Sequence, residues 1–175
     1  MMTYKDALRE AMRNLAVEPR TRFIGYGLKN GRAAGSLANA SETQIIETPV
    51  AENLMTGIAI GQSLGGNLPL VYFERFDFVL NAADAIVNHL SAAEHISRGV
   101  FKPAVILRVV VGNRAKPLFT GKTHTQDFSA AFAGMVDFPV VALTEPSEIL
   151  AEYRSARERQ HNGISTMLVE YKDLI

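Results

Sequence analysis

Two runs of this chain are apolar at nearly every position, and they limit the folds that it can adopt. They cover residues 104–111 and 140–143. A strand with one face in water alternates apolar and polar side chains, whereas a strand covered on both faces is apolar throughout. The two runs therefore predict a parallel sheet that lies between two layers of helices.

The rest of the chain alternates between strand patterns and helix patterns. Apolar residues at helical spacing predict helices over residues 3–17, 51–64, 78–96, 126–132 and 147–160. Short apolar segments predict further strands over residues 22–26, 43–47, 68–73 and 166–170. Residues 27–42 are rich in Gly, Ala, Ser and Asn and indicate a loop. We expect residues 1–175 to form one α/β domain, a three-layer αβα arrangement with a mainly parallel sheet of five or six strands.

Charge and composition argue against several classes of partner. Lys and Arg together number 18, as do Asp and Glu, so the formal net charge is zero. This balance gives no basis for binding nucleic acid or an anionic membrane surface. The sequence has no cysteine, and no stretch of it approaches the roughly 20 apolar residues that span a bilayer. We therefore expect a cytoplasmic protein without disulfides.

Two glycine motifs have little diagnostic value. Residues 121–123, Gly-Lys-Thr, resemble the end of a phosphate-binding P-loop, but Lys116 stands where the pattern requires its first glycine. Residues 25–27, Gly-Tyr-Gly, lack the third glycine of a dinucleotide-binding turn. Neither motif supports a nucleotide site.

The four histidines lack the spacing of a metal site. His89 and His95 fall in a predicted helix and are expected to be surface or packing residues. His124 follows the most apolar strand, at the end of a parallel sheet where ligands bind. From position alone, His124 is either an ordinary loop residue or part of a site.

The predicted helix over residues 51–64 combines a glutamate with small residues. Glu52 in its first turn fits an ordinary partner of the helix dipole. Gly57, Gly61 and Gly65 are spaced four apart. They allow either close packing of this helix on its own sheet or close approach of a helix from a partner chain.

Three short segments, taken in order, carry a more specific signal. They are IIETPVAE at residues 45–52 with GIAIG at 57–61, FERFDF at 73–78, and HTQ at 124–126. They resemble IIDTPISE with a small-residue helix, FMTFNF and HSQ in the pyrimidine-binding domain of the transketolase superfamily of thiamine diphosphate enzymes. The resemblance is strongest to the beta subunit of the thiamine-dependent component of 2-oxo acid dehydrogenases.

This resemblance implies a role for four residues. Glu52 matches the buried glutamate that hydrogen-bonds N1′ of the cofactor's aminopyrimidine ring, which makes the 4′-amino group basic enough to remove the C2 proton. Phe76 matches the aromatic residue that stacks on the pyrimidine, and Phe73 is expected to line the same pocket. His124 matches a histidine that faces the reacting carbon and moves protons on the substrate adduct.

The resemblance also implies a partner. The superfamily binds magnesium and diphosphate through a Gly-Asp-Gly motif, which this sequence lacks. We therefore expect thiamine diphosphate to be shared with a diphosphate-binding, alpha-like subunit that holds Mg²⁺, in an α2β2 assembly acting on a 2-oxo acid or a ketose. The alternative is a non-catalytic partner subunit. Two departures leave the substrate open: Tyr26-Gly27 replaces an acidic pair, and Arg75 replaces a small neutral residue.

Overall fold

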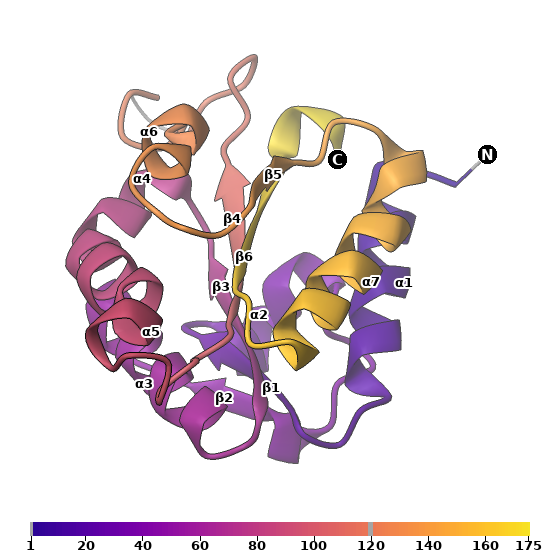
Figure 1. Cartoon of the computed structure of the whole chain (residues 1–175). Helices are drawn as coiled ribbons and strands as arrows, with labels where there is room; N and C mark the ends of the chain where they lie inside the picture. The colour runs from indigo at the N-terminus through magenta and orange to yellow at the C-terminus, as the bar shows by residue number, and fades with distance from the viewer. Residues whose placement is uncertain (1, 119–120) are drawn as a thin grey trace.

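Six parallel strands form one sheet in the computed structural model, which describes residues 2–118 and 121–175 (Figure 1). The sheet order is β2-β1-β3-β4-β6-β5, and every neighbouring pair is parallel. The strands are β1 (Thr21–Gly25), β2 (Ile45–Glu47), β3 (Leu68–Phe73), β4 (Ile106–Val111), β5 (Val140–Ala142) and β6 (Thr166–Tyr171). The predicted three-layer α/β fold with a parallel sheet is confirmed.

Helices cover both faces of this sheet. The α-helices are α1 (Tyr4–Ala16), α2 (Leu28–Gly35), α3 (Glu52–Leu64), α4 (Phe76–Val79), α5 (Ala93–Ile96), α6 (Ser129–Ala133) and α7 (Pro146–His161). Helices α1 and α7 lie on one side of the sheet, and α3, α4 and α5 lie on the other (Figure 1). Helices that are far apart in the sequence, such as α1 and α7, therefore lie side by side on one face of the sheet.

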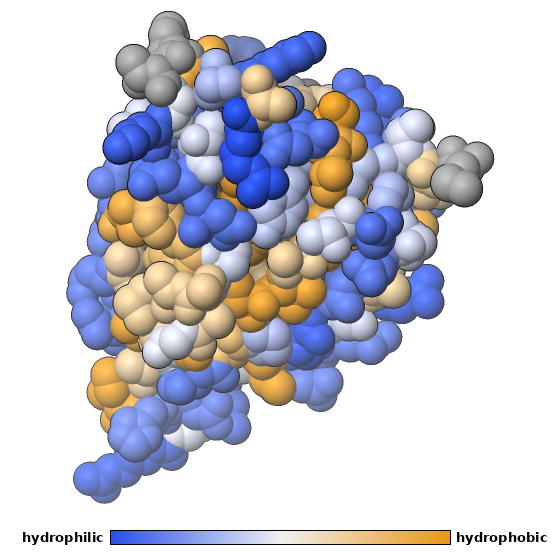
Figure 2. Space-filling view, turned by 90° about the horizontal axis from the view of Figure 1, so that it is seen from above, coloured by the Kyte–Doolittle hydropathy of each residue, from blue (hydrophilic) through white to orange (hydrophobic). Residues whose placement is uncertain are grey.

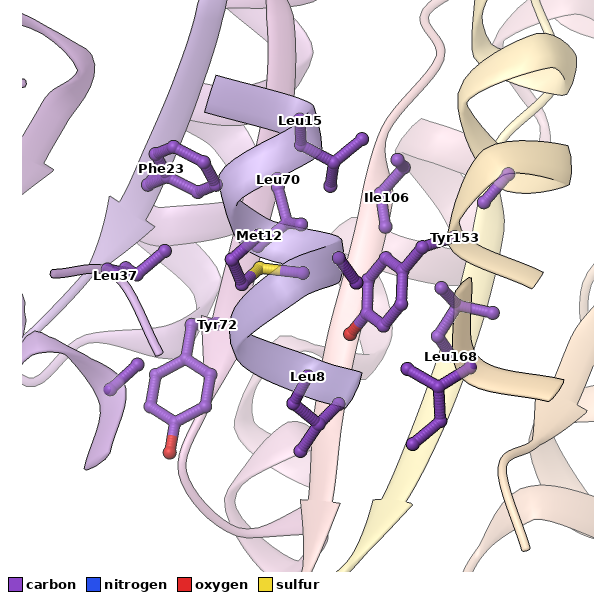
Figure 3. Packing of buried hydrophobic residues seen from close by; sticks show 14 of the residues in the cluster. Leu8, Met12, Leu15, Phe23, Leu37, Leu70, Tyr72, Ile106, Tyr153 and Leu168 are labelled. Atoms are coloured by element: carbon purple, nitrogen blue, oxygen red, sulfur yellow. The ribbon is translucent and has the colours of Figure 1, made fainter. Parts of the chain in front are cut away.

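Helix α1 shows why the sequence folds in this way. Leu8, Met12 and Leu15 recur at helical spacing, so they share one face of α1 and are buried against the sheet and α7 (Figure 3). The Thr3 hydroxyl caps the helix by accepting a hydrogen bond from the Asp6 N–H at 3.1 Å. Together these features place α1 beside α7.

A buried ion pair joins the neighbouring strands β4 and β6 on this face. Arg108 on β4 donates from Nε and Nη2 to the Glu170 carboxylate on β6, at 2.7 and 3.0 Å. Its Nη1 donates to Ser36 Oγ at 2.7 Å, and the Tyr153 hydroxyl donates to Glu170. Since both charged groups are fully hydrogen-bonded, the pair is tolerated in the core, and losing either partner would strand a buried charge.

The other face holds the second apolar cluster. Met55 and Ala59 of α3 pack with Phe73, Phe76 and Val79, and all five are completely buried. Every residue of β4 is buried, as its apolar run predicted. The run at 140–143 was expected to be covered on both faces, but β5 is only partly buried because it is the edge strand.

Residues 27–42, predicted as a loop, contain helix α2, and this prediction was wrong. The Glu47 carboxylate at the end of β2 accepts hydrogen bonds from the N–H groups of Gly27 and Lys29, the latter at 2.8 Å. A carboxylate 18 residues along the chain from Lys29 thus provides the acceptor for N–H groups that the first turn of α2 cannot pair within the helix. Leu28 and Leu37 are buried and anchor this segment to the core.

The helix predicted over residues 78–96 is in fact divided. It begins two residues earlier, with α4, and continues as a 3₁₀ turn at Leu80–Ala82 and a π-helix at Ala85–Ser91 before α5. Helix α7 begins at Pro146, one residue before its predicted start at residue 147, because proline is pre-organised for the first helical position. Within the described ranges, no helix is both long enough and apolar enough to cross a membrane.

Candidate functional site

The segments that carry the sequence motifs meet at one edge of the sheet. All six strands are parallel, so their carboxyl ends lie at the same edge, which is where open α/β sheets bind ligands. Figure 1 shows β4 running toward this end of the molecule, and Figure 2 looks down on it. On this face, apolar surface lies between hydrophilic side chains (Figure 2).

Glu52 is held at the start of helix α3. The Thr48 N–H donates to the Gly25 carbonyl at 3.0 Å, which ties the end of β2 to the end of β1 just before the helix begins. The Glu52 side chain is largely buried, with 5% of the residue exposed, and Asn81 Nδ2 donates to its Oε2 at 3.3 Å.

Tyr26 lies close to Glu52. Burial raises the pKa of the Tyr26 hydroxyl, and the Glu52 carboxylate raises that pKa further. Both effects disfavour the phenolate, so Tyr26 remains a neutral hydroxyl at physiological pH. This position is one of the two at which the chain departs from the family pattern.

The aromatic residues of the FERFDF segment have different surroundings. Phe73 and Phe76 are completely buried, and Phe76 packs on Phe128 and Phe132 with ring centroids 5.8 and 5.6 Å apart. Phe78 is only partly buried, and its ring meets His124 edge to face at 5.5 Å. The ring that is accessible beside His124 is therefore Phe78.

Sequence reasoning singled out Phe76 and Phe73 and left Phe78 without a role. A signal was nevertheless present. Residues two apart on a helix point about 200° apart, so Phe76 and Phe78 cannot both face the core once the helix begins at Phe76. Because the helix was predicted to start at residue 78, the sequence did not predict that Phe76 and Phe78 point in different directions.

A close backbone contact fixes the position of His124. Gly112 directly follows β4, and a Cβ at this position would lie 1.8 Å from the His124 carbonyl oxygen. Only glycine fits there, because any side chain would displace the loop. Gly121, at φ +86°, accepts a hydrogen bond from the His124 N–H at 3.0 Å, and Thr123 Oγ1 lies 3.1 Å from His124 Nδ1.

Two hydrogen bonds attach the following segment to the fold. Gln126 Nε2 donates to Asp77 Oδ1 on α4 at 2.7 Å. The Tyr171 hydroxyl, at the end of β6, donates to Asp127 Oδ2 at 2.8 Å. The loop that carries His124 is therefore fastened to both α4 and β6. Among residues 2–118 and 121–175, no three His, Cys, Asp or Glu side chains are grouped as metal ligands.

The glycines of α3 face away from the sheet. A Cβ added at Gly57 or Gly61 would meet no atom within 4 Å. Leu54 and Leu64 on the same helix are also exposed, at 46% and 51%. Close packing of these two glycines on the chain's own sheet, one of the two alternatives considered for them, is therefore wrong. Gly65 lies at the C-terminal cap of α3.

Comparisons with known proteins agree with this geometry. A family model described as the transketolase pyrimidine binding domain matches residues 1–174. The mitochondrial pyruvate dehydrogenase E1 component subunit beta of Saccharomyces cerevisiae is 30% identical over 146 residues, covering 80% of this chain and 39% of that protein. The corresponding subunit of Rickettsia conorii is 28% identical over 147 residues, covering 81% and 44%. This chain thus spans about two fifths of the length of these relatives.

Solved structures share the fold at low sequence identity. A protein described as a split gene transketolase, inactive beta4 tetramer, superposes with a TM-score of 0.74 at 16% identity, over 98% of this chain and 52% of that chain. Transketolase from Campylobacter jejuni gives 0.75 at 16%, over 97% and 26%. The family match over almost the whole sequence, on a parallel sheet of the same fold, shows that this chain belongs to the family of transketolase pyrimidine-binding domains.

Proposed function

We propose that this chain is the pyrimidine-binding subunit of a split thiamine diphosphate-dependent enzyme. The enzyme would act on a 2-oxo acid or a ketose, by decarboxylation or by transfer of an acyl or two-carbon group. The observation that carries this proposal is Glu52, a buried carboxylate on the first turn of α3 at the ligand-binding edge of the sheet. Family membership and the names of the relatives support the same function.

The residues at this edge fit one end of the cofactor. Glu52 would hold N1′ of the aminopyrimidine, and Asn81 would keep its carboxylate in place. Phe78 offers an accessible ring for stacking, and Phe73 would support the pocket from the core. When bound, thiamine diphosphate supplies a nucleophilic carbanion for attack on the substrate carbonyl. His124 would hold or move a proton on the substrate side of that carbon.

We infer that the ligands of the cofactor's diphosphate come from a second subunit. The sequence contains no Gly-Asp-Gly, and no metal-ligand group occurs in the described parts of the chain. A second subunit carrying Gly-Asp-Gly and a downstream Asn would bind the diphosphate and Mg²⁺, in an α2β2 complex. The exposed Gly57 and Gly61 on α3 provide a surface that a partner helix can approach closely. Residues 1–175 would act as one pyrimidine-binding domain.

The rival function is a non-catalytic subunit that keeps the fold and the interface. Such a chain needs the outer face of α3 but gains nothing from a buried carboxylate. Burial of Glu52 costs desolvation free energy, which the helix dipole and the long hydrogen bond from Asn81 offset only in part. This favours the catalytic function over the structural one.

Replacing Glu52 with Gln tests the proposal. Gln keeps the shape and can hydrogen-bond N1′, but it cannot exchange a carboxyl proton with the ring. In the complex reconstituted with the Gly-Asp-Gly subunit, we expect the cofactor to bind while its C2 proton exchanges about 10²–10⁴-fold more slowly, the range of general acid–base effects. Hydrogen–deuterium exchange at C2, followed by NMR after acid quench, measures this rate.

A matched control separates catalysis from helix stability. Glu148 is an exposed acid in the first turn of α7, so Glu148→Gln removes a similar helix-dipole interaction away from the motif segments. It should leave C2 exchange unchanged. Exchange in the Glu52→Gln complex as fast as in the unmodified one would mean that Glu52 is not the activating acid and would leave the non-catalytic function standing.

A further inference from the structure

Arg75 is buried beside the His124 loop. It directly precedes α4, and only 7% of the residue is exposed. Its Cδ lies 3.3 Å from the position of a Cβ built on Gly112, the glycine against which the His124 carbonyl packs. Arg75 therefore lies where the end of β4, the start of α4 and the His124 loop converge.

The hydrogen bonds of the Arg75 guanidinium are incomplete. Nη1 donates to the Glu74 carbonyl and, at 3.5 Å, to Glu74 Oε1. Nε is buried and has no hydrogen-bond partner among the described residues. A buried donor without a partner costs about 1–3 kcal/mol, and more when it carries charge. The guanidinium of Arg75 thus retains a donor that no acceptor among the described residues satisfies.

The acids next to Arg75 in the sequence pair with it weakly or not at all in the described structure. The Glu74 side chain is 47% exposed, so water weakens its pairing with Arg75. Asp77, the buried acid of α4, is bonded to Gln126 and makes no ion pair with Arg75 in the described structure. On the other side, burial lowers the pKa of Lys172, and the charge of Arg75 lowers it further, so a second cation lies nearby.

Arg75 is also within electrostatic reach of the Glu52 end of the site. Tyr26 experiences both charges: the Glu52 carboxylate raises its pKa, and Arg75 lowers it. Tyr26 and Arg75, the two positions at which this chain departs from the family pattern, therefore interact electrostatically with each other, and Tyr26 also interacts with Glu52. Arg75 therefore lies within electrostatic reach of the proposed reaction centre rather than on a remote surface.

We propose that Arg75 determines substrate specificity by binding the anionic group of the donor substrate, a carboxylate or a phosphate ester, through its guanidinium, which keeps an unpartnered N–H donor. A guanidinium suits this role because its planar N–H donors match the oxygens of both groups in a bidentate arrangement. This assignment rests on the proposed function, since it requires that a donor substrate binds at this edge.

The test compares charged and uncharged donors in the complex reconstituted with the diphosphate-binding subunit. The variants are Arg75→Gln and Arg75→Lys. Arg114→Gln is the control, because Arg114 lies on the loop that follows β4 and is an exposed arginine that pairs with Asp173. The donors are pyruvate, D-xylulose 5-phosphate and the uncharged L-erythrulose. Steady-state KM and kcat are measured for each donor.

We expect Arg75→Gln to raise KM for an anionic donor by roughly 10- to 150-fold, the loss of one charge-assisted hydrogen bond of about 1.5–3 kcal/mol. Arg75→Lys should recover part of this loss. KM for L-erythrulose should change less than about twofold, because this donor has no anionic group and so loses no interaction with Arg75. An effect on pyruvate alone identifies a carboxylate, and an effect on xylulose 5-phosphate alone identifies a phosphate.

A binding measurement makes the result independent of turnover. Calorimetric titration of the cofactor-free complex with pyruvate and with inorganic phosphate should show anion affinity that falls in Arg75→Gln and is retained in Arg114→Gln. Equal KM changes for charged and uncharged donors, or unchanged anion affinity in Arg75→Gln, overturn the assignment of Arg75 but leave the proposed function standing. Absence of C2 exchange in the unmodified complex overturns the proposed function, and the donor assignment falls with it.

Discussion

Phe76 and Phe78 are two residues apart, yet the fold gives them opposite surroundings. Phe76 is enclosed by Phe128 and Phe132, whereas Phe78 presents part of its ring beside His124. A ring must expose a face before a ligand can stack on it. At the scale of single residues, accessibility therefore favours Phe78 as the ring that meets the aminopyrimidine, and it gives Phe76 the role of supporting α4.

Alanine substitutions should separate these two roles. Phe76→Ala should lower the free energy of unfolding by about 3–5 kcal/mol, the usual cost of removing a buried phenyl ring. Phe78→Ala should cost about 1 kcal/mol or less but weaken thiamine diphosphate binding by up to about tenfold, since aromatic pairs contribute 0.5–1.5 kcal/mol beyond burial. Chemical denaturation of the chain and calorimetry of the reconstituted complex measure the two effects.

The milder Phe76→Leu provides the check, because leucine preserves most of the packing. If Phe76→Leu weakens cofactor binding while Phe78→Ala does not, Phe76 is the stacking ring and moves when the partner binds. The sequence predicted Glu52 in the first turn of a helix and His124 in the loop after the most apolar strand, and both lie there. Which phenyl ring is accessible depends on where α4 begins, and on Phe128 and Phe132, which lie some 50 residues further along.

At the scale of elements, α2 depends on a contact that is distant in sequence. The Glu47 carboxylate at the end of β2 accepts from the N–H groups of Gly27 and Lys29, and so satisfies donors in the first turn of the helix. The segment itself is rich in small residues and predicts a loop. Its helical structure therefore relies on Glu47 and on the burial of Leu28 and Leu37.

Glu47→Gln should loosen α2 without unfolding the sheet. The amide keeps one acceptor but loses the charge that favours a helix N-terminus, so we expect a loss of about 0.5–2 kcal/mol, the range for helix caps. Hydrogen exchange should show reduced protection at the amides of Gly27 and Lys29 and no change in α7. Equal loss of protection in both helices would mean that Glu47 stabilises the whole fold rather than α2.

The elements that were predicted well have local causes. Strand β3 was predicted at its observed bounds, because an apolar run is preceded by the glycine-rich end of α3. The π-helix at Ala85–Ser91 has no local signal of this kind, since its apolar spacing also suits an α-helix. Element type thus follows from local pattern, whereas caps and changes in helical pitch follow from tertiary contacts.

At the scale of the whole molecule, the parallel sheet was predictable and its strand order was not. Apolar strands such as β4 require cover on both faces, which implies helical crossovers and parallel pairing. The order β2-β1-β3-β4-β6-β5 depends on which strands pair at long range, and the Arg108–Glu170 ion pair between β4 and β6 is one such contact. A single sequence does not encode these pairings locally.

The two helical layers differ in how completely their helices are packed within this chain. Helices α1 and α7 pack against each other over one face of the sheet, and their apolar stripes are buried there. Helix α3 buries Met55 and Ala59 on the other face but leaves Gly57 and Gly61 with open space beyond them. An interior glycine costs a helix roughly 1 kcal/mol relative to alanine, and within the described chain no packing contact offsets that cost. We therefore assign the outer face of α3 to the proposed partner subunit.

Substitutions at Gly61 should separate folding from association. In the isolated chain, Gly61→Ala and Gly61→Leu should both raise the free energy of unfolding by up to about 1 kcal/mol, because each improves helix propensity and no neighbour is close enough to clash. In the complex, Gly61→Leu should weaken association about 5- to 150-fold, because overpacking typically costs 1–3 kcal/mol. Arg154→Leu, at an exposed position of α7, controls for added apolar surface. Denaturant titration of the chain and sedimentation of the complex give the two quantities, and undiminished association of Gly61→Leu would remove α3 from the interface.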